Sequence, residues 1–117
     1  MRAHVDHRPI DIDMMRATAR RLLAEDAEPP MAEELETLTL QLRGYIMLAI
    51  PEVEAAARRL PEDDAPRECA LIAVREARGR LDTAPLNATL PAGIAHAQRL
   101  ARMVWALCDH HENLRCD

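Results

Sequence analysis

Apolar residues recur at helical spacing near the beginning of the chain. Along residues 11 to 26, the positions three and four residues apart on one face are Ile12, Met15, Ala19 and Leu22. Asp11 or Asp13 can cap the start of this segment. Pro29 and Pro30 follow it, and proline disfavours helical backbone in the residue before it. The spacing therefore predicts a short amphipathic helix from residue 11 or 13 to about residue 26.

A longer apolar stripe predicts a second helix that begins near Pro30. Its positions are Met31, Leu35, Leu38, Leu42, Ile46 and Ala49. At 100° per residue the stripe continues past Pro51 to Val53 and Leu60. Proline lacks the amide hydrogen that the Met47 carbonyl would accept in a regular helix. We therefore expect a helix over residues 30 to 60 that is kinked or broken at Pro51.

The second helix carries more apolar surface than one buried stripe needs. Leu40, Gly44 and Met47 form a second row that lies about 150° around the helix from the first. This surplus indicates either that the helix is central in the bundle or that the second row lies in a subunit interface.

Two more helices are predicted in the second half of the chain. Asp63 or Asp64 can cap a helix from residue 65 or 66 to 81, whose inward positions are Ala70, Val74, Ala77 and Leu81. A connection of residues 82 to 91 follows, and Thr89 can cap a helix from 91 to about 114. Alternating strand patterns are absent. The pattern predicts an all-α, single-domain, four-helix bundle-like fold over residues 11–117, preceded by a mobile N-terminal arm of residues 1–10.

The predicted fourth helix contains the most informative pattern of chemical groups. Cys108 and His111 are three residues apart on one face, and Cys116 follows shortly after them. Thiolate and imidazole are the ligands that zinc prefers, so these three residues are a candidate for half of a zinc site. The alternatives for His111 are a partly buried structural histidine and a catalytic base. Cys108 also fits the core as a small hydrophobic residue.

Charge and composition exclude several classes of function. The net charge of the 117 residues is −5, all 15 basic residues are arginine, and they are scattered among acidic residues. No continuous basic face results, so nucleic acid is not an expected partner. The three glycines are too far apart for a glycine-dependent phosphate loop. The absence of a long apolar run or signal segment predicts a cytoplasmic protein without membrane contact, in which the three cysteines are reduced.

The only two aromatic residues, Tyr45 and Trp105, are the largest side chains available to a core rich in alanine and leucine. Trp105 lies at the edge of the apolar arc of its helix. It is therefore a candidate interface anchor or a residue that packs on a neighbouring helix of its own subunit. Arginines such as Arg99 and Arg102 fit either an anionic ligand or a solvated face paired with glutamates.

Residues 14 to 114 resemble a group of small actinobacterial proteins that form a domain of unknown function labelled natural product biosynthesis protein. The most specific pieces are the segment from Gly44 to Pro51, the RRLPEDD turn and the HAQRLARMVWALCDHHENL helix. The resemblance implies a link with secondary metabolism and supplies no catalytic residues.

These observations lead to three hypotheses about function. The first is a non-catalytic accessory or regulatory protein that acts through protein contacts, as a homodimer or on a biosynthetic partner. Its candidate surface or pocket residues are Leu40, Gly44, Tyr45, Met47 and Trp105. The second is a binding module for a small apolar metabolite or a metal ion near Cys108 and His111. The third is a small enzyme with His111 as base, which we rank last because no second polar group supports it.

Overall fold

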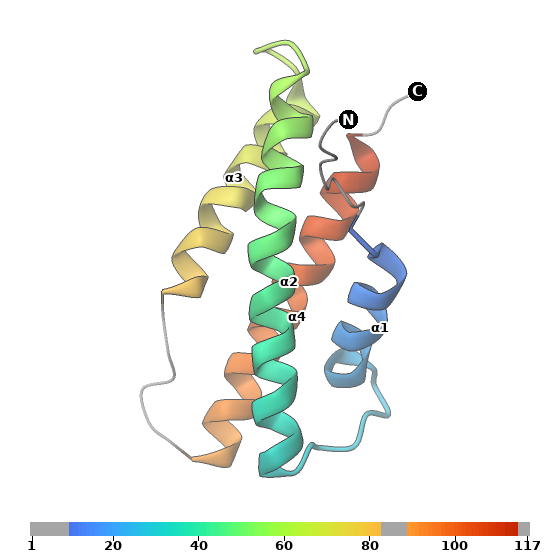
Figure 1. Ribbon diagram of the computed structural model, residues 1–117, viewed down its shortest axis with the longest axis vertical. Helices are drawn as coiled ribbons and strands as arrows, with labels where there is room; N and C mark the ends of the chain where they lie inside the picture. The colour runs from blue at the N-terminus through green and yellow to red at the C-terminus, as the bar shows by residue number, and fades with distance from the viewer. Residues whose placement is uncertain (1–9, 83–88, 115–117) are drawn as a thin grey trace, which may run out of the picture.

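The computed structural model describes residues 10–82 and 89–114, which form four α-helices and no strand (Figure 1). The helices are α1 (Ile12–Leu23), α2 (Ala32–Arg58), α3 (Ala65–Leu81) and α4 (Leu90–Asn113). The predicted fold class is confirmed, because the chain forms a four-helix bundle-like structure. The expected mobile arm lies mostly outside the described residues. Its last member, Ile10, packs against the core and so belongs to the bundle.

Side-chain caps begin three of the helices where the sequence predicts them. The carboxylate of Asp11 accepts a hydrogen bond from the Met14 amide at 3.0 Å, and that of Asp64 accepts one from the Arg67 amide at 3.0 Å. The Thr89 hydroxyl accepts one from the Ala92 amide at 3.3 Å. Each cap satisfies an amide that has no partner within its own helix. Between Asp11 and Asp13, the structure selects Asp11.

The second helix is not broken at Pro51. It runs without interruption from Ala32 to Arg58, and Val53 and Ala57 beyond the proline are fully buried. Burial of these residues on the same stripe as Ile46 compensates for the hydrogen bond that Pro51 cannot donate. Met31 differs from expectation, because it lies at the N-cap and is 74% exposed.

The core lies between α2 and α4, which cross the middle of the bundle. Figure 1 shows α2 in front of α4, α3 on one side and α1 on the other. α3 and α4 run antiparallel (Figure 1). The fully buried large side chains include Met15, Leu42, Ile46, Leu100 and Leu107. No helix in the described ranges is long and apolar enough to span a bilayer.

Candidate interaction surfaces

One side of α2 is apolar and exposed to solvent. We call this surface the α2 face; its members are Leu40, Gly44, Met47, Leu48, Pro51 and Ala55. The exposed fractions of Leu40, Met47 and Leu48 are 66%, 61% and 59%. These residues fall within about 100° of arc by the 3.6-residue period, opposite the buried stripe. The predicted second row is therefore on the outside of the bundle, and the central position of α2 does not account for it.

Gly44 leaves a gap in the middle of the α2 face. A Cβ atom placed on Gly44 would have no neighbouring atom within 4 Å, and the backbone there is ordinary helix. Neither close packing within the chain nor an unusual backbone angle requires glycine at this position. A glycine in a helix interior costs about 0.5–1 kcal/mol relative to alanine. The subunit by itself therefore shows no packing benefit from Gly44.

Opposite charges lie at the two ends of the α2 face. Glu33 and Glu36 are exposed in the first turns of the helix, and Arg58 is its last residue. Arg58 donates a hydrogen bond to Glu54 at 3.1 Å, and Arg78 of α3 donates a second at 2.8 Å. These two guanidinium groups, Arg78 first, lower the pKa of the Glu54 carboxyl. The helix thus carries negative charge at its start. At its end, one carboxylate is surrounded by two guanidinium groups, so the charge there is positive overall.

The two aromatic candidates lie away from the α2 face. Tyr45 is half-buried and packs against the core. Two guanidinium groups of α1 lie over the Trp105 ring, because Arg16 and Arg20 are each 5.3 Å from its centroid. Arg16 also pairs with Asp109 and, at 3.0 Å, with Glu112 of α4. Trp105 therefore packs on a neighbouring helix of its own subunit, one of the two alternatives that its sequence position allows.

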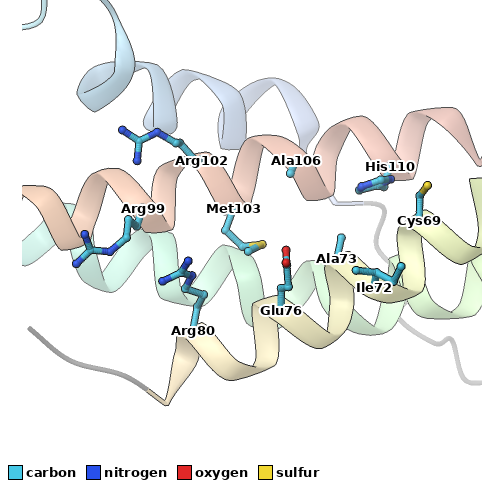
Figure 2. A pocket seen from close by; sticks show the side chains of 10 residues that line it. All are labelled: Cys69, Ile72, Ala73, Glu76, Arg80, Arg99, Arg102, Met103, Ala106 and His110. Atoms are coloured by element: carbon cyan, nitrogen blue, oxygen red, sulfur yellow. The ribbon is translucent and has the colours of Figure 1, made fainter.

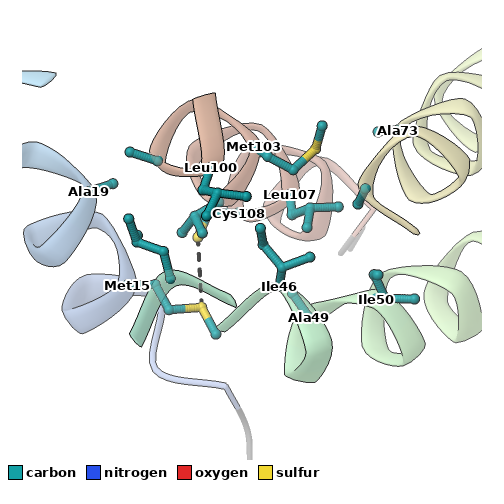
Figure 3. Close-up of a cluster of buried hydrophobic side chains, with 14 of the residues drawn as sticks. Met15, Ala19, Ile46, Ala49, Ile50, Ala73, Leu100, Met103, Leu107 and Cys108 are labelled. Carbon is teal, nitrogen blue, oxygen red and sulfur yellow. Dashed lines mark hydrogen bonds between the residues drawn. The ribbon is translucent and has the colours of Figure 1, made fainter. Parts of the chain in front are cut away.

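Cys108 belongs to the core of the bundle. It is fully buried, and its sulfur lies 3.9 Å from the sulfur of Met15 on α1 (Figure 3). Burial raises the pKa of the Cys108 thiol to about 11, so the neutral thiol is favoured over the thiolate that zinc requires. Within residues 10–82 and 89–114, no three His, Cys, Asp or Glu side chains are grouped to hold a metal ion. Cys116 lies outside the described residues, and His111 is half-buried.

A groove of about 650 Å³ separates α3 from α4 on another side of the molecule. We call it the α3/α4 groove. Its apolar floor consists of Ile72, Ala73, Met103 and Ala106. Figure 2 shows Arg80 and Arg99 at one end. Cys69 and His110 lie at the other end, with Glu76 between the two ends.

A profile for a family of unknown function, DUF6415, matches residues 13–116. The chain belongs to this family. The matched range takes in all four helices apart from the first residue of α1. The α2 face and the α3/α4 groove both lie within it. No match was found among curated proteins or among solved structures.

His96 is a buried titratable residue that the sequence patterns of this DUF6415 chain did not single out. It is 7% exposed and lies on the inward side of α4. Burial lowers its pKa first, and the positive charges of Arg99, Arg43 and Arg80 lower it further. His96 lies four residues before Leu100 and seven before Met103, which places it on the same face of the helix as both. The helical period could therefore have predicted that His96 is buried.

Proposed function

We propose that this protein is a non-catalytic helical interaction protein that forms a homodimer through the α2 face. The observation that supports the proposal is the exposed apolar row, with a gap at Gly44 that nothing in the subunit fills. Exposed apolar side chains are common singly, whereas a contiguous row on one helix is typical of a contact surface.

The α2 face is complementary to itself when two copies pack antiparallel. In one register, Met47 of each copy lies opposite Gly44 of the other, so a long flexible side chain enters the gap above a glycine. The same register places Leu40 opposite Pro51. A twofold axis repeats both contacts, as an isologous interface requires.

Charge complementarity favours the same register. It places Glu33 of one copy opposite Arg58 of the other, at both ends of a contact about 38 Å long. The parallel arrangement would instead place like charges together at each end. Contact between single helices lies at the low end of interface sizes, about 1,200 Å² or less. We therefore expect a reversible dimer whose population rises with protein concentration.

Sedimentation equilibrium over a range of concentrations tests the dimer. The variant Met47→Glu places two charges in the apolar contact, and we expect it to remain monomeric at concentrations where the unmodified chain dimerises. Met14→Glu is the matched control, because Met14 is 54% exposed on α1, outside the α2 face. A chain that stays monomeric at every concentration, or Met14→Glu and Met47→Glu samples that dimerise equally, would contradict the proposal.

Charge reversal tests the register separately from dimer formation. Glu33→Arg and Arg58→Glu should each weaken self-association, because each variant places like charges opposite each other. An equimolar mixture of the two variants should form a heterodimer, because an arginine then faces a glutamate at both ends of the contact. One end holds the unmodified pair and the other holds the reversed pair. If neither single variant nor the mixture differs from the unmodified chain, the antiparallel register is wrong.

We further propose that the homodimer is a cytoplasmic accessory protein of natural product biosynthesis that contacts a biosynthetic or regulatory protein. The support is the resemblance of residues 14 to 114 to proteins with that label. Deletion of the gene, followed by metabolite profiling, tests the role. Complementation by the unmodified chain and by Met47→Glu then shows whether the α2 face is required. An unchanged metabolite profile after deletion would contradict the accessory role.

A further inference from the structure

The α3/α4 groove has the composition of a site for an amphipathic small molecule, and it is independent of the α2 face. Its floor is apolar over the middle turns of both helices, and Ile72 in the floor is 48% exposed. Ligand pockets typically combine such an apolar lining with a few polar groups that fix orientation. The groove volume of about 650 Å³ falls in the range of small-molecule sites.

Positive charge gathers at one end of the groove. Arg80 from α3 and Arg99 from α4 lie there together because the two helices run antiparallel (Figure 2). Arg43 of α2 donates a hydrogen bond to the Leu81 carbonyl at 2.8 Å, which holds a third cation close to this end. Within the described part of the chain, Arg99 forms no ion pair with a carboxylate, so its charge is not neutralised there.

The position of His96 is consistent with these cations lying around one place. His96 is buried beside this end, and the charges of Arg99, Arg43 and Arg80 all disfavour its protonation, in addition to the effect of burial. The three arginines come from three different helices. A convergent positive field of this kind favours an anion at the groove end.

We infer that the α3/α4 groove binds an elongated apolar molecule that carries a single anionic headgroup, with the headgroup on Arg80 and Arg99. Guanidinium groups fit both carboxylate and phosphate oxygens, so the headgroup class includes both. The apolar part lies along Ile72, Met103 and Ala106. From Cys69 to Arg80 the helix rises about 16 Å, which gives room for an extended chain of medium length.

The polar groups outside the cationic end limit which molecules fit. Glu76 lies between the two ends, so a second anionic group in the middle of the ligand would face a carboxylate. Its oxygens can accept a hydrogen bond from a ligand hydroxyl instead. His110 and Cys69 at the far end are compatible with a neutral terminus. A molecule with one anionic group at one end is compatible with all of these side chains, because its charge faces the arginines and its uncharged part lies beside Glu76, His110 and Cys69.

Isothermal titration calorimetry with decanoate and decyl phosphate as probes tests the inference, with decanol and decyltrimethylammonium as controls. We expect both anions to bind with one-to-one stoichiometry. Both controls should bind at least about tenfold more weakly. A hydroxyl accepts weaker hydrogen bonds from guanidinium than an anion does, and the quaternary ammonium accepts none and is repelled by the arginines. The two anions together show whether the end prefers carboxylate or phosphate. Equal binding of decanoate, decanol and the cation would overturn the inference.

Two variants and one matched control place the binding in the groove. Arg99→Gln removes a cation at the groove end and should weaken decanoate binding at least about tenfold. Ile72→Glu places a charge on the floor and should also weaken binding. Arg75→Gln is the control, because Arg75 is an exposed arginine of α3 that does not line the groove. Equal affinities of Arg99→Gln and Arg75→Gln would overturn the assignment.

Nuclear magnetic resonance gives a readout that does not depend on affinity. A bound anion offsets the field of Arg99, Arg43 and Arg80, so saturating decanoate should raise the pKa of His96, whereas decanol should leave it unchanged. An unchanged His96 pKa at saturation would show that the headgroup binds elsewhere. The Met47→Glu variant should bind decanoate like the unmodified chain, so failure of the dimer and failure of the groove are distinguishable.

Discussion

Burial is the main cause of the pKa shifts of His96 and Cys108, which go in opposite directions. In both cases the low-polarity interior disfavours the charged form, so the imidazole loses its proton more readily and the thiol retains its proton more strongly. At the scale of single residues, the interior of this bundle therefore keeps its titratable groups neutral. Reactivity toward thiol reagents is accordingly expected at the exposed Cys69 and not at Cys108.

His96 makes stability depend on pH below neutrality. Its folded-state pKa is lower than its unfolded-state pKa of about 6.5, so the unfolded chain binds a proton first as the pH falls. Neutral His96 contributes fully to the free energy of unfolding above about pH 6.5. This contribution is lost as the pH falls toward the folded-state pKa. We expect the free energy of unfolding, measured in urea, to fall less steeply in His96→Gln than in the unmodified chain as the pH is lowered from about 7 to 5. Identical slopes for the two proteins would exclude His96 as the cause.

At the scale of the helix, each of the three glycines lies inside an element, and one of them differs from the other two in its surroundings. Gly44 and Gly79 have open space where a Cβ would be, whereas a Cβ on Gly93 would lie 2.9 Å from Leu35 Cδ2. The close approach of α4 to α2 accounts for Gly93. For Gly44, the proposed contact with Met47 of a second copy supplies a reason that the subunit lacks.

Alanine substitution of these glycines separates helix propensity from packing. Gly44→Ala and Gly79→Ala should each raise the stability of the monomer by about 0.5–1 kcal/mol, because alanine loses less backbone entropy on folding. Gly93→Ala should gain less or lose stability, because Leu35 must move. Urea unfolding in the Met47→Glu background measures the monomer alone. A gain at Gly93 as large as that at Gly79 would contradict the packing argument.

The variants Gly44→Ala and Gly79→Ala also test whether Gly44 takes part in the proposed dimer contact. In the chain that retains Met47, Gly44→Ala should weaken self-association, since the added methyl partly fills the gap opposite Met47. Gly79→Ala lies on α3 and should leave self-association unchanged. Sedimentation equilibrium measures both, and equal effects of the two variants would argue against the Gly44 contact.

At the scale of the whole molecule, α1 is attached mainly to α4. Its apolar stripe of Met15, Ala19 and Leu22 is buried, and Arg16 adds a contact with Trp105 and ion pairs with Asp109 and Glu112. The Arg16 side chain is only 18% exposed, so these interactions are less screened than those of a fully exposed pair. The attachment of α1 therefore combines a short apolar stripe with one polar cluster.

Arg16→Gln should destabilise the bundle and loosen α1 first. We expect a loss of about 1–2 kcal/mol in the free energy of unfolding, because a partly buried charge pair and a cation–π contact disappear together. Hydrogen exchange should show lower protection in α1 than in α3. Arg78→Gln is the control, because the Arg78 side chain is 54% exposed and solvent screens its ion pair with Glu54, so the loss of stability should be smaller. Uniform loss of protection in all helices would contradict selective loosening of α1.

The four helices were predictable because their signals are local. Asp11, Asp64 and Thr89 cap helices within their own segments, and the 3.6-residue period identifies the buried faces without knowledge of any partner. The apolar stripe also predicted that the helix direction continues past Pro51. The sequence alone did not decide that the helix stays unbroken there, because that depends on the burial of Val53 and Ala57 against other helices.

The surfaces were predictable only in part. The row of Leu40, Gly44 and Met47 follows from helical spacing, but whether it faces the core or solvent depends on which side of α2 the other helices cover. The α3/α4 groove left only a partial signal in the sequence. Arg99 and Arg102 were candidates for an anionic ligand, but Arg80 lies far from Arg99 along the chain and meets it only through antiparallel packing. The sequence by itself determined the helices and their faces, since both follow from short-range spacing. Only the tertiary structure decided which faces stay open and which charges converge, because those outcomes depend on contacts between distant segments.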